Sequence, residues 1–181
     1  MPQAPTPDGN GPALDIRRII EALDRHGVEY LLVGGMAARF YGAARMTKDV
    51  DLVPNSHAEN LDRLAMTLRD LGAFLRVGGL SDEDAQALPV VLDAAALERM
   101  EISTWRTDAG DLDVLAVLRA GDGRRIGFAE LVERSSSTSV GSLSIRLAAL
   151  GDIIESKRFA NREKDQEALP ELERLKAESE E

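Results

Sequence analysis

Hydrophobic and polar residues along this chain follow two periods, one typical of helices and one typical of strands. Residues 13–27 place apolar side chains at helical spacing and end at a glycine, which predicts an amphipathic helix. Residues 28–35 form a short apolar run that ends in two glycines, which predicts a strand and a turn. A short helix over 36–42, a strand over 48–54 and a helix over 57–72 are expected to follow.

The middle of the chain has a less regular pattern. Residues 73–77 indicate a strand, and residues 78–89 carry glycines, acids and a proline, which indicate a loop. After a short helix over 93–100, two strand-like runs at 100–107 and 111–118 are joined by the turn Asp-Ala-Gly. This arrangement predicts a β-hairpin.

The last third of the chain is expected to be mostly helical. Residues 120–127 indicate a loop, 128–135 a short helix, and the serine-rich run at 135–139 a polar connection. From residue 143 one short strand gives way to helices, and Pro170 is expected to bend or divide the last of them. The pattern as a whole predicts an α/β or α+β sheet domain with a hairpin and a C-terminal helical extension.

Length and composition set the domain organisation that we expect. With 181 residues, of which 44% are hydrophobic, the chain suits one domain with a real core plus a helical extension. We expect a disordered lead over 1–12, one domain over 13–147, and an extension over 148–181 that packs on that domain.

Several classes of protein are excluded by composition. The sequence has no cysteine, so it has no disulfide framework and no thiolate metal site, and two histidines make a histidine-rich zinc site a poor expectation. No apolar run approaches the roughly 20 residues that cross a bilayer. The proline- and glycine-rich start lacks the features of a signal peptide, so we expect a cytoplasmic protein with no membrane partner.

The net charge of −10 argues against binding of nucleic acid over the whole surface. A local basic patch is one interpretation of the arginines and lysines that cluster at 124–125 and at 157–164. The alternative for both clusters is a solvated surface, which is the usual fate of charge runs.

Two aspartates one residue apart, Asp49 and Asp51, lie on the predicted strand over 48–54. Residues i and i+2 of a strand point to the same face, so the two carboxylates would lie side by side. Such a pair repels and resists desolvation, and a divalent cation such as Mg²⁺ removes both penalties. The alternative is an exposed strand end whose acids pair with Lys48 or Arg45, and a D-x-D motif alone favours that alternative.

Three further features favour a phosphate and metal site. Gly34 and Gly35 lie between a strand and a helix, where a phosphate can approach backbone N–H groups. Asp111 and Asp113 share one face of a second strand, and they would add a carboxylate if that strand neighbours the first. Residues 157–165 gather Lys157, Arg162, Lys164 and Asp165 around a helix end.

The order and spacing of these features resemble the nucleotidyltransferase superfamily whose prototype is the polymerase-beta-like palm. More narrowly, residues 34–52, 110–115 and 150–165 resemble the small bacterial nucleotidyltransferases of the AbiEii type, which include toxins of type IV toxin–antitoxin systems. The resemblance runs from about residue 15 to about residue 170. It implies a nucleotidyltransferase-type mixed sheet and a magnesium-dependent transfer of a nucleoside monophosphate from an NTP to a hydroxyl acceptor.

The resemblance also implies roles for the matching positions. Asp49 and Asp51 match the D-x-D motif and would hold two Mg²⁺ ions. Asp113 matches the third acid, which binds the catalytic metal and activates the attacking hydroxyl, and Asp111 is the reserve for that role. The positions that match nucleotide-binding motifs are Gly34, Gly35, Arg45, Thr47, Lys157, Arg162 and Asp165.

The motifs assign more detailed roles within that set. Many members of the family have Gly-Ser where this chain has Gly34-Gly35, and the missing hydroxyl removes one phosphate contact. Arg45 and Thr47 match an R-x-T motif that would face the triphosphate. The catalytic set includes Lys157, which would contact the nucleotide phosphates, and Asp165 would orient Lys157 or Arg162.

The acceptor is left open by the sequence. The toxin-like branch implies the tRNA 3′ end as acceptor, and a possible antitoxin protein as partner. An aminoglycoside-like small molecule is the alternative, because the acidic run at 81–85 suits a cationic substrate; a protein hydroxyl is a third class. A catalytically inactive member that binds only a nucleotide or a partner is the non-enzyme alternative.

Overall fold

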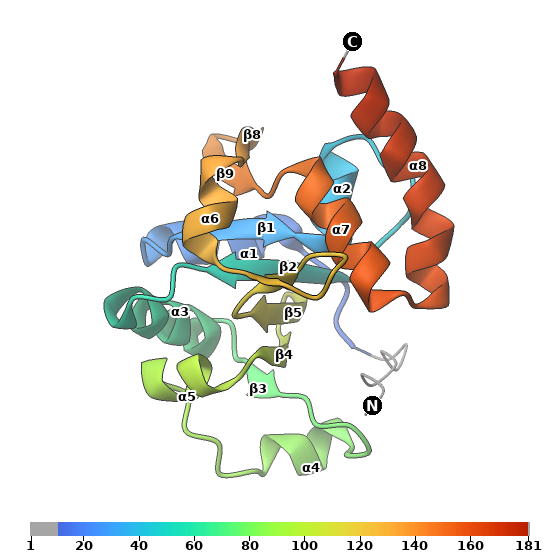
Figure 1. The fold of residues 1–181 in the computed structure, drawn as a ribbon. Helices are drawn as coiled ribbons and strands as arrows, with labels where there is room; N and C mark the ends of the chain where they lie inside the picture. The colour runs from blue at the N-terminus through green and yellow to red at the C-terminus, as the bar shows by residue number, and fades with distance from the viewer. Residues whose placement is uncertain (1–10, 181) are drawn as a thin grey trace.

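The structure of the protein is a computed structural model that describes residues 11–180 (Figure 1). The predicted lead at 1–12 lies outside the described residues except for its last two positions. In chain order the elements are α1 (Ile16–Arg25), β1 (Tyr30–Val33), α2 (Gly34–Phe40), β2 (Asp49–Pro54), α3 (Ala58–Asp70), β3 (Phe74–Leu75), α4 (Asp82–Gln86), α5 (Ala94–Arg99), β4 (Ile102–Thr107), β5 (Gly110–Leu115), β6 (Leu118–Arg119), β7 (Arg125–Ile126), α6 (Phe128–Glu133), β8 (Ser136–Val140), β9 (Leu143–Leu147), α7 (Leu150–Ala160) and α8 (Glu163–Ser179).

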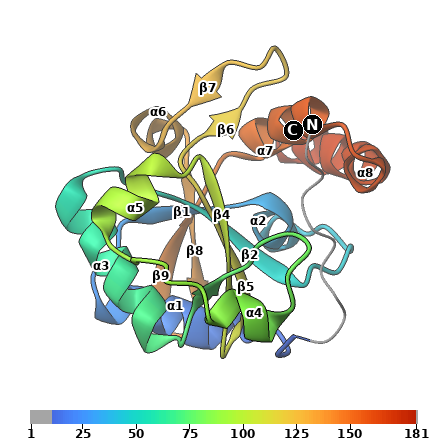
Figure 2. The same cartoon turned by 90° about the horizontal axis from the view of Figure 1, so that it is seen from below.

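The sheet is mixed, as the sequence predicts, and its strands run in the order β3-β4-β5-β2-β1-β9-β8. β2 pairs with β5 in parallel and with β1 in antiparallel orientation, so β2 lies in the middle of the sheet. Figure 2 shows α1 and α3 on one side of the sheet, and α6, α7 and the small β6–β7 hairpin on the other. No helix within the described part of the chain is long and apolar enough to cross a membrane.

Local sequence accounts for the first helix. The side chain of Asp15 accepts a hydrogen bond from the backbone N–H of Arg18 and caps the start of α1. Ile19, Ile20 and Leu23 recur at helical spacing and are buried. The glycine at 27 follows the helix in a left-handed conformation, with φ of +64°, and ends it as predicted.

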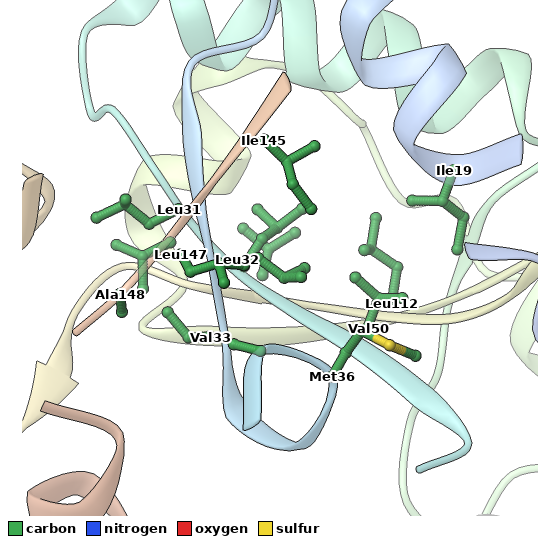
Figure 3. Close-up of a cluster of buried hydrophobic side chains, with 14 of the residues drawn as sticks. Ile19, Leu31, Leu32, Val33, Met36, Val50, Leu112, Ile145, Leu147 and Ala148 are labelled. Carbon is green, nitrogen blue, oxygen red and sulfur yellow. The ribbon is translucent and has the colours of Figure 1, made fainter. Parts of the chain in front are cut away.

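The core is formed by the apolar residues of the central strands and of the helices that cover them. Figure 3 shows Val50 of β2 and Leu112 of β5 close to Ile19 of α1, and all three are fully buried. Trp105 of β4 is also buried and belongs to the same core. Because strand residues alternate, burial of Val50 and Leu112 directs the intervening aspartates to the opposite face.

Three elements were not predicted from the sequence. Residues 78–89 contain α4, whose first turn is capped by Ser81 through the backbone N–H of Asp84, so this acidic run is partly helical and not a loop throughout. The serine-rich connection is the edge strand β8, whose backbone pairs with β9 although its side chains are polar. Residues 120–127 include β7, and the run at 111–118 is split into β5 and β6.

Pro170 does not divide the last helix, because α8 continues through it from Glu163 to Ser179. Pro170 is exposed, whereas Ala168 and Leu172 on either side of it are buried. Packing of these apolar side chains therefore outweighs the hydrogen bond that the proline cannot donate.

Two substitutions in α3 test how its burial stabilises the fold. Leu64 is 0% exposed and belongs to the core, whereas Met66 on the same helix is 42% exposed. We expect Leu64→Ala to lower the free energy of unfolding by about 2–4 kcal/mol, since it removes buried atoms and leaves a cavity. Met66→Ala, the matched control, should cost about 0.5 kcal/mol or less. Urea unfolding measures both, and equal losses would contradict the arrangement of α3 on the sheet.

Candidate functional site

Four carboxylates gather on one face of the two central strands. The parallel pairing of β2 with β5 sets Asp49 opposite Asp111 and Asp51 opposite Asp113. Within each strand the two aspartates are two residues apart, so all four side chains lie on the same face of the sheet. The strand that carries Asp113 is therefore a direct neighbour of the strand that carries the D-x-D motif.

A glycine turn lies directly against these acids. Gly34 begins α2, two residues earlier than predicted, and has a φ of +62°. A Cβ atom on Gly34 would lie 2.2 Å from Oδ2 of Asp51. Both the backbone conformation and the close approach of the carboxylate therefore require glycine at this position.

The charge of Asp51 is strongly disfavoured in this setting. Burial raises its pKa to about 8, and the neighbouring charges of Asp113 and Asp49 add to the rise. The positive charges of Lys157 and Lys164 act in the opposite direction. The side chain is therefore surrounded by other ionisable groups, and its ionised form needs more positive charge than these two lysines supply.

Asp113 shows the same tendency in a weaker form. Burial raises its pKa to about 6, while hydrogen bonding from Thr104, which lies opposite it on β4, lowers the pKa, and the charges of Asp49 and Asp111 raise it. Its Oδ1 atom is buried and has no hydrogen-bond partner in the part of the chain that the structure describes. A buried carboxylate oxygen without a partner is costly, so this atom is a natural ligand for a cation.

Asp111, the reserve candidate for the third acid, is already neutralised by arginine. Arg106 donates to it from Nε to Oδ1 at 2.9 Å and from Nη2 to Oδ2 at 3.2 Å, and Nη1 of Arg76 lies 3.4 Å from Oδ2. Arg106 is 4% exposed and also pairs with Asp82 of α4. Asp113, in contrast, keeps an oxygen without a partner, so the structure favours Asp113 over Asp111 as a metal ligand.

The C-terminal helices bring positive charge to the acid face. Asp165, which is 1% exposed, accepts hydrogen bonds from Lys157 Nζ at 3.3 Å and from Arg162 Nε at 2.6 Å. Burial alone would raise the pKa of Asp165, but the hydrogen bonds and charges of Arg162 and Lys157 outweigh it, and the pKa is lowered. Asp165 therefore holds both basic side chains at the junction of α7 and α8, next to α2 (Figure 1).

Lys164 was grouped with this cluster by sequence but was given no site role. Its charge acts on both Asp51 and Asp113, and it forms no ion pair with any residue in 11–180. Lys157 and Arg162, by contrast, are both bound to Asp165. The position of Lys164 next to Asp165 at the start of a helix could have drawn attention to it in the sequence. Which of the three basic residues pair with Asp165 can be known only from the structure.

Arg45 and Thr47 occupy different environments. Nη1 of Arg45 lies 2.7 Å from Oε2 of Glu167, so Arg45 ties the segment before β2 to α8, and both side chains are about half exposed. Thr47 donates a hydrogen bond from its hydroxyl to Oδ1 of Asp49 at 2.7 Å. Arg45 therefore contacts α8, whereas Thr47 contacts an acid of the D-x-D motif.

No ready-made metal cage exists among residues 11–180, where no three His, Cys, Asp or Glu side chains are arranged to enclose an ion. The acids nevertheless suit Mg²⁺, which is usually held by one or two carboxylates together with water and substrate phosphates. The buried Oδ1 of Asp113 without a partner, and the raised pKa values of Asp51 and Asp113, fit a group of oxygens that a cation would stabilise.

No model of a known protein family matches the sequence, and no curated protein matches it. Solved structures do match the fold. The lincosamide antibiotic adenylyltransferase LnuA, in its lincomycin-bound form, superposes with a TM-score of 0.58 and 14% identity, over 90% of this chain and 99% of that chain. ANT(2″)-Ia in complex with adenylyl-2″-tobramycin gives 0.51 and 18% identity, over 90% and 92% of the two chains.

A third solved structure, from Thermotoga maritima, carries only a provisional assignment as a nucleotidyltransferase. Its TM-score is 0.52 at 14% identity, over 86% of this chain and 88% of that chain. At such low identities the likeness concerns the fold alone. The mixed sheet flanked by helices is therefore the fold that nucleotidyltransferases use, and the narrower AbiEii-type resemblance stays a prediction.

Proposed function

We propose that this protein is a metal-dependent nucleotidyltransferase, which transfers a nucleoside monophosphate from an NTP to a hydroxyl acceptor. The observation that carries the proposal is the pairing of β2 with β5, which places Asp113 beside Asp51 on the face that meets the glycine turn. The fold shared with solved nucleotidyltransferases supports the same reaction.

Asp49, Asp51 and Asp113 are the residues that would hold two Mg²⁺ ions. The high pKa of Asp51 and the buried Oδ1 of Asp113 support this assignment, because both features are relieved by a bound cation. The bound metal would stabilise negative charge on the attacking and the leaving oxygens.

The basic residues and the glycine turn would bind the triphosphate. Gly34 and Gly35 lack side chains, so phosphate oxygens can approach their backbone N–H groups. Lys164, which has no ion pair in the described chain, and Lys157, which Asp165 holds in place, both act on the acid face through their charges. Arg162, oriented by the same Asp165, adds a third positive group.

The chemical step is an in-line substitution at the α-phosphorus. A bond forms from the acceptor oxygen to the α-phosphorus, the bond to the bridging oxygen of the β-phosphate breaks, and pyrophosphate leaves. Asp113 would take the proton of the acceptor hydroxyl, a role supported by the position of its carboxylate beside Asp51 on the acid face. The lysines would stabilise the charge that develops on the leaving pyrophosphate.

The sheet order supports an acceptor that approaches from the side of β5 and β4. The glycine turn follows β1, and α2 contacts α7, so the phosphate-binding groups lie on the β1 side of β2. In-line attack requires the acceptor opposite the leaving pyrophosphate, which is the side of β5 and β4. That flank carries Thr104 and Arg106, and α4 is attached to it through the ion pair of Asp82 with Arg106.

Two acceptor classes follow. The AbiEii-type resemblance favours the tRNA 3′ end, in a toxin that an antitoxin protein would neutralise. A small hydroxylated cation is favoured by one specific observation, the attachment of the acidic helix α4 to the acceptor flank through Asp82. Two of the solved structures with this fold, an antibiotic adenylyltransferase with lincomycin and ANT(2″)-Ia with adenylyl-2″-tobramycin, support the second class.

Substitution of the D-x-D acids tests the proposed reaction. We expect Asp49→Asn and Asp51→Asn each to lower transfer at least about 100-fold, since each removes a metal ligand, while the fold remains intact. Release of pyrophosphate from each of the four NTPs measures transfer, and circular dichroism checks the fold. Asp62→Asn, an exposed acid on α3, is the matched control. Full activity in either site variant would refute the metal assignment.

The pH dependence of stability provides a test that needs no substrate. Because the pKa of Asp51 rises from 3.8 to about 8 on folding, its contribution to stability is complete below pH 4 and is lost as the pH rises to 8. In metal-free protein we therefore expect Asp51→Asn to be stabilising by several kcal/mol at pH 8 and nearly neutral at pH 4. Thermal unfolding in the presence of a chelator measures this difference. A gain that is independent of pH would contradict the buried charge.

A comparison of acceptors separates the two classes and the inactive alternative. Purified protein is incubated with Mg²⁺, each α-labelled NTP, and either total tRNA or a panel of aminoglycosides and lincosamides. We expect label on one acceptor class only, because the flank beside α4 cannot suit both a polyanion and a polycation. The Asp49→Asn variant is the control for contaminating transferases. Stabilisation by NTP and Mg²⁺ with no product on any acceptor would favour a binding protein instead.

A further inference from the structure

The hydroxyl of Thr47 can donate one hydrogen bond, and two acceptor oxygens lie within reach of it. Oγ1 lies 2.7 Å from Oδ1 of Asp49 and 3.3 Å from the backbone oxygen of the same residue. The shorter contact is a charge-assisted hydrogen bond, which is stronger than a bond between neutral groups. Thr47 therefore restrains the Asp49 side chain through one carboxylate oxygen and leaves the other oxygen free.

The same threonine explains the glycine at position 35. A Cβ atom on Gly35 would lie 3.1 Å from Oγ1 and 3.2 Å from Cβ of Thr47, which is tighter than ordinary contacts. Unlike Gly34, Gly35 does not have a positive φ, so its backbone alone does not require glycine. The space that a side chain at 35 would need is partly filled by Thr47.

We propose that Thr47 is a positioning residue for the metal-binding carboxylate of Asp49, and that Gly35 is glycine because it gives Thr47 room. This inference rests on the proposed function and deepens it. The Thr47 hydroxyl reaches the space beside the glycine turn from the segment just before β2. The Thr47 hydroxyl would thus orient the metal-binding carboxylate of Asp49 and would not contact phosphate.

The hydrogen bond from Thr47 orders the side chain of Asp49 before the metal binds. An aspartate side chain without a partner samples several χ1 and χ2 angles, and fixing it on metal binding costs conformational entropy. A hydrogen bond that already holds Asp49 removes part of that cost, so the metal binds more tightly. Hydrogen bonds to the side chains that hold a metal commonly change metal affinity by about 10-fold or more.

Substitutions at Thr47 test the role of the hydroxyl. We expect Thr47→Val, which keeps the shape, to weaken Mn²⁺ binding measured by calorimetry about 5- to 10-fold and to raise the Mg²⁺ concentration for half-maximal turnover by a similar factor. Thr47→Ser restores the hydroxyl and should stay within about twofold of wild type. Thr138→Val on β8, away from the acids, is the control for loss of a threonine hydroxyl.

Substitution of Gly35 tests the steric half of the proposal. Gly35→Ala adds a Cβ against Thr47, so we expect it to weaken Mn²⁺ binding about as much as Thr47→Val does. In a Thr47→Ala background the hydroxyl has already been lost, so the added alanine should have little further effect. Such non-additivity is the signature of two residues that act through one contact.

The outcomes separate this inference from the proposed function. Unchanged Mn²⁺ binding and Mg²⁺ dependence in folded Thr47→Val, with an active wild type, would overturn the positioning role and leave the transfer reaction standing. An equal defect in Thr47→Ser would also overturn it, because the hydroxyl would then not be the cause. Mn²⁺ binding that survives Asp49→Asn would instead refute the metal site on which both proposals rest.

Discussion

The in-register parallel pairing of β2 with β5 is the constraint on which the site depends. Val50 and Leu112 are fully buried, and the aspartates that alternate with them point to the other face. A slip of one residue in either strand would put a carboxylate in the core and an aliphatic side chain on the acid face. Hydrophobic burial therefore sets the positions of Asp51 and Asp113, although neither residue contributes to that burial.

The four carboxylates on this face are not equivalent, and their partners decide what each can do. Asp111 lies between two arginines, which satisfy its charge, and Asp49 is restrained by the hydroxyl of Thr47. Asp51 and Asp113 receive less compensation, so their pKa values rise. The result is a face on which Asp111 is neutralised while Asp51 and Asp113 are not fully compensated, an arrangement that lowers the stability of the metal-free fold.

Sequence periodicity was sufficient to predict the central strands, the helices that cover them and the face that carries the acids, because alternation and burial are local signals. It was not sufficient for the state of Asp111, since Arg106 and Arg76 reach it from β4 and from the segment after β3. The edge strand β8 was missed because its polar side chains do not show the alternating pattern of a strand, whereas its backbone pairs with β9. Helix α4 was missed because its five residues, four of them acidic or polar and one a buried alanine, resemble a loop.

In the proposed reaction, the distribution of charge would separate recognition of the nucleotide from recognition of the acceptor. The protein as a whole carries a net charge of −10, so the field at a distance repels polyanions. Lys157, Arg162 and Lys164 place positive charge only locally, around the junction of α7 and α8, where it acts on the acid face. An RNA acceptor would have to bring many phosphates past the acidic surface, whereas a small cation would be drawn toward it. Electrostatics thus favours the small cationic acceptor of the proposed reaction, because an RNA acceptor would need a basic surface beyond the three residues proposed to bind the nucleotide.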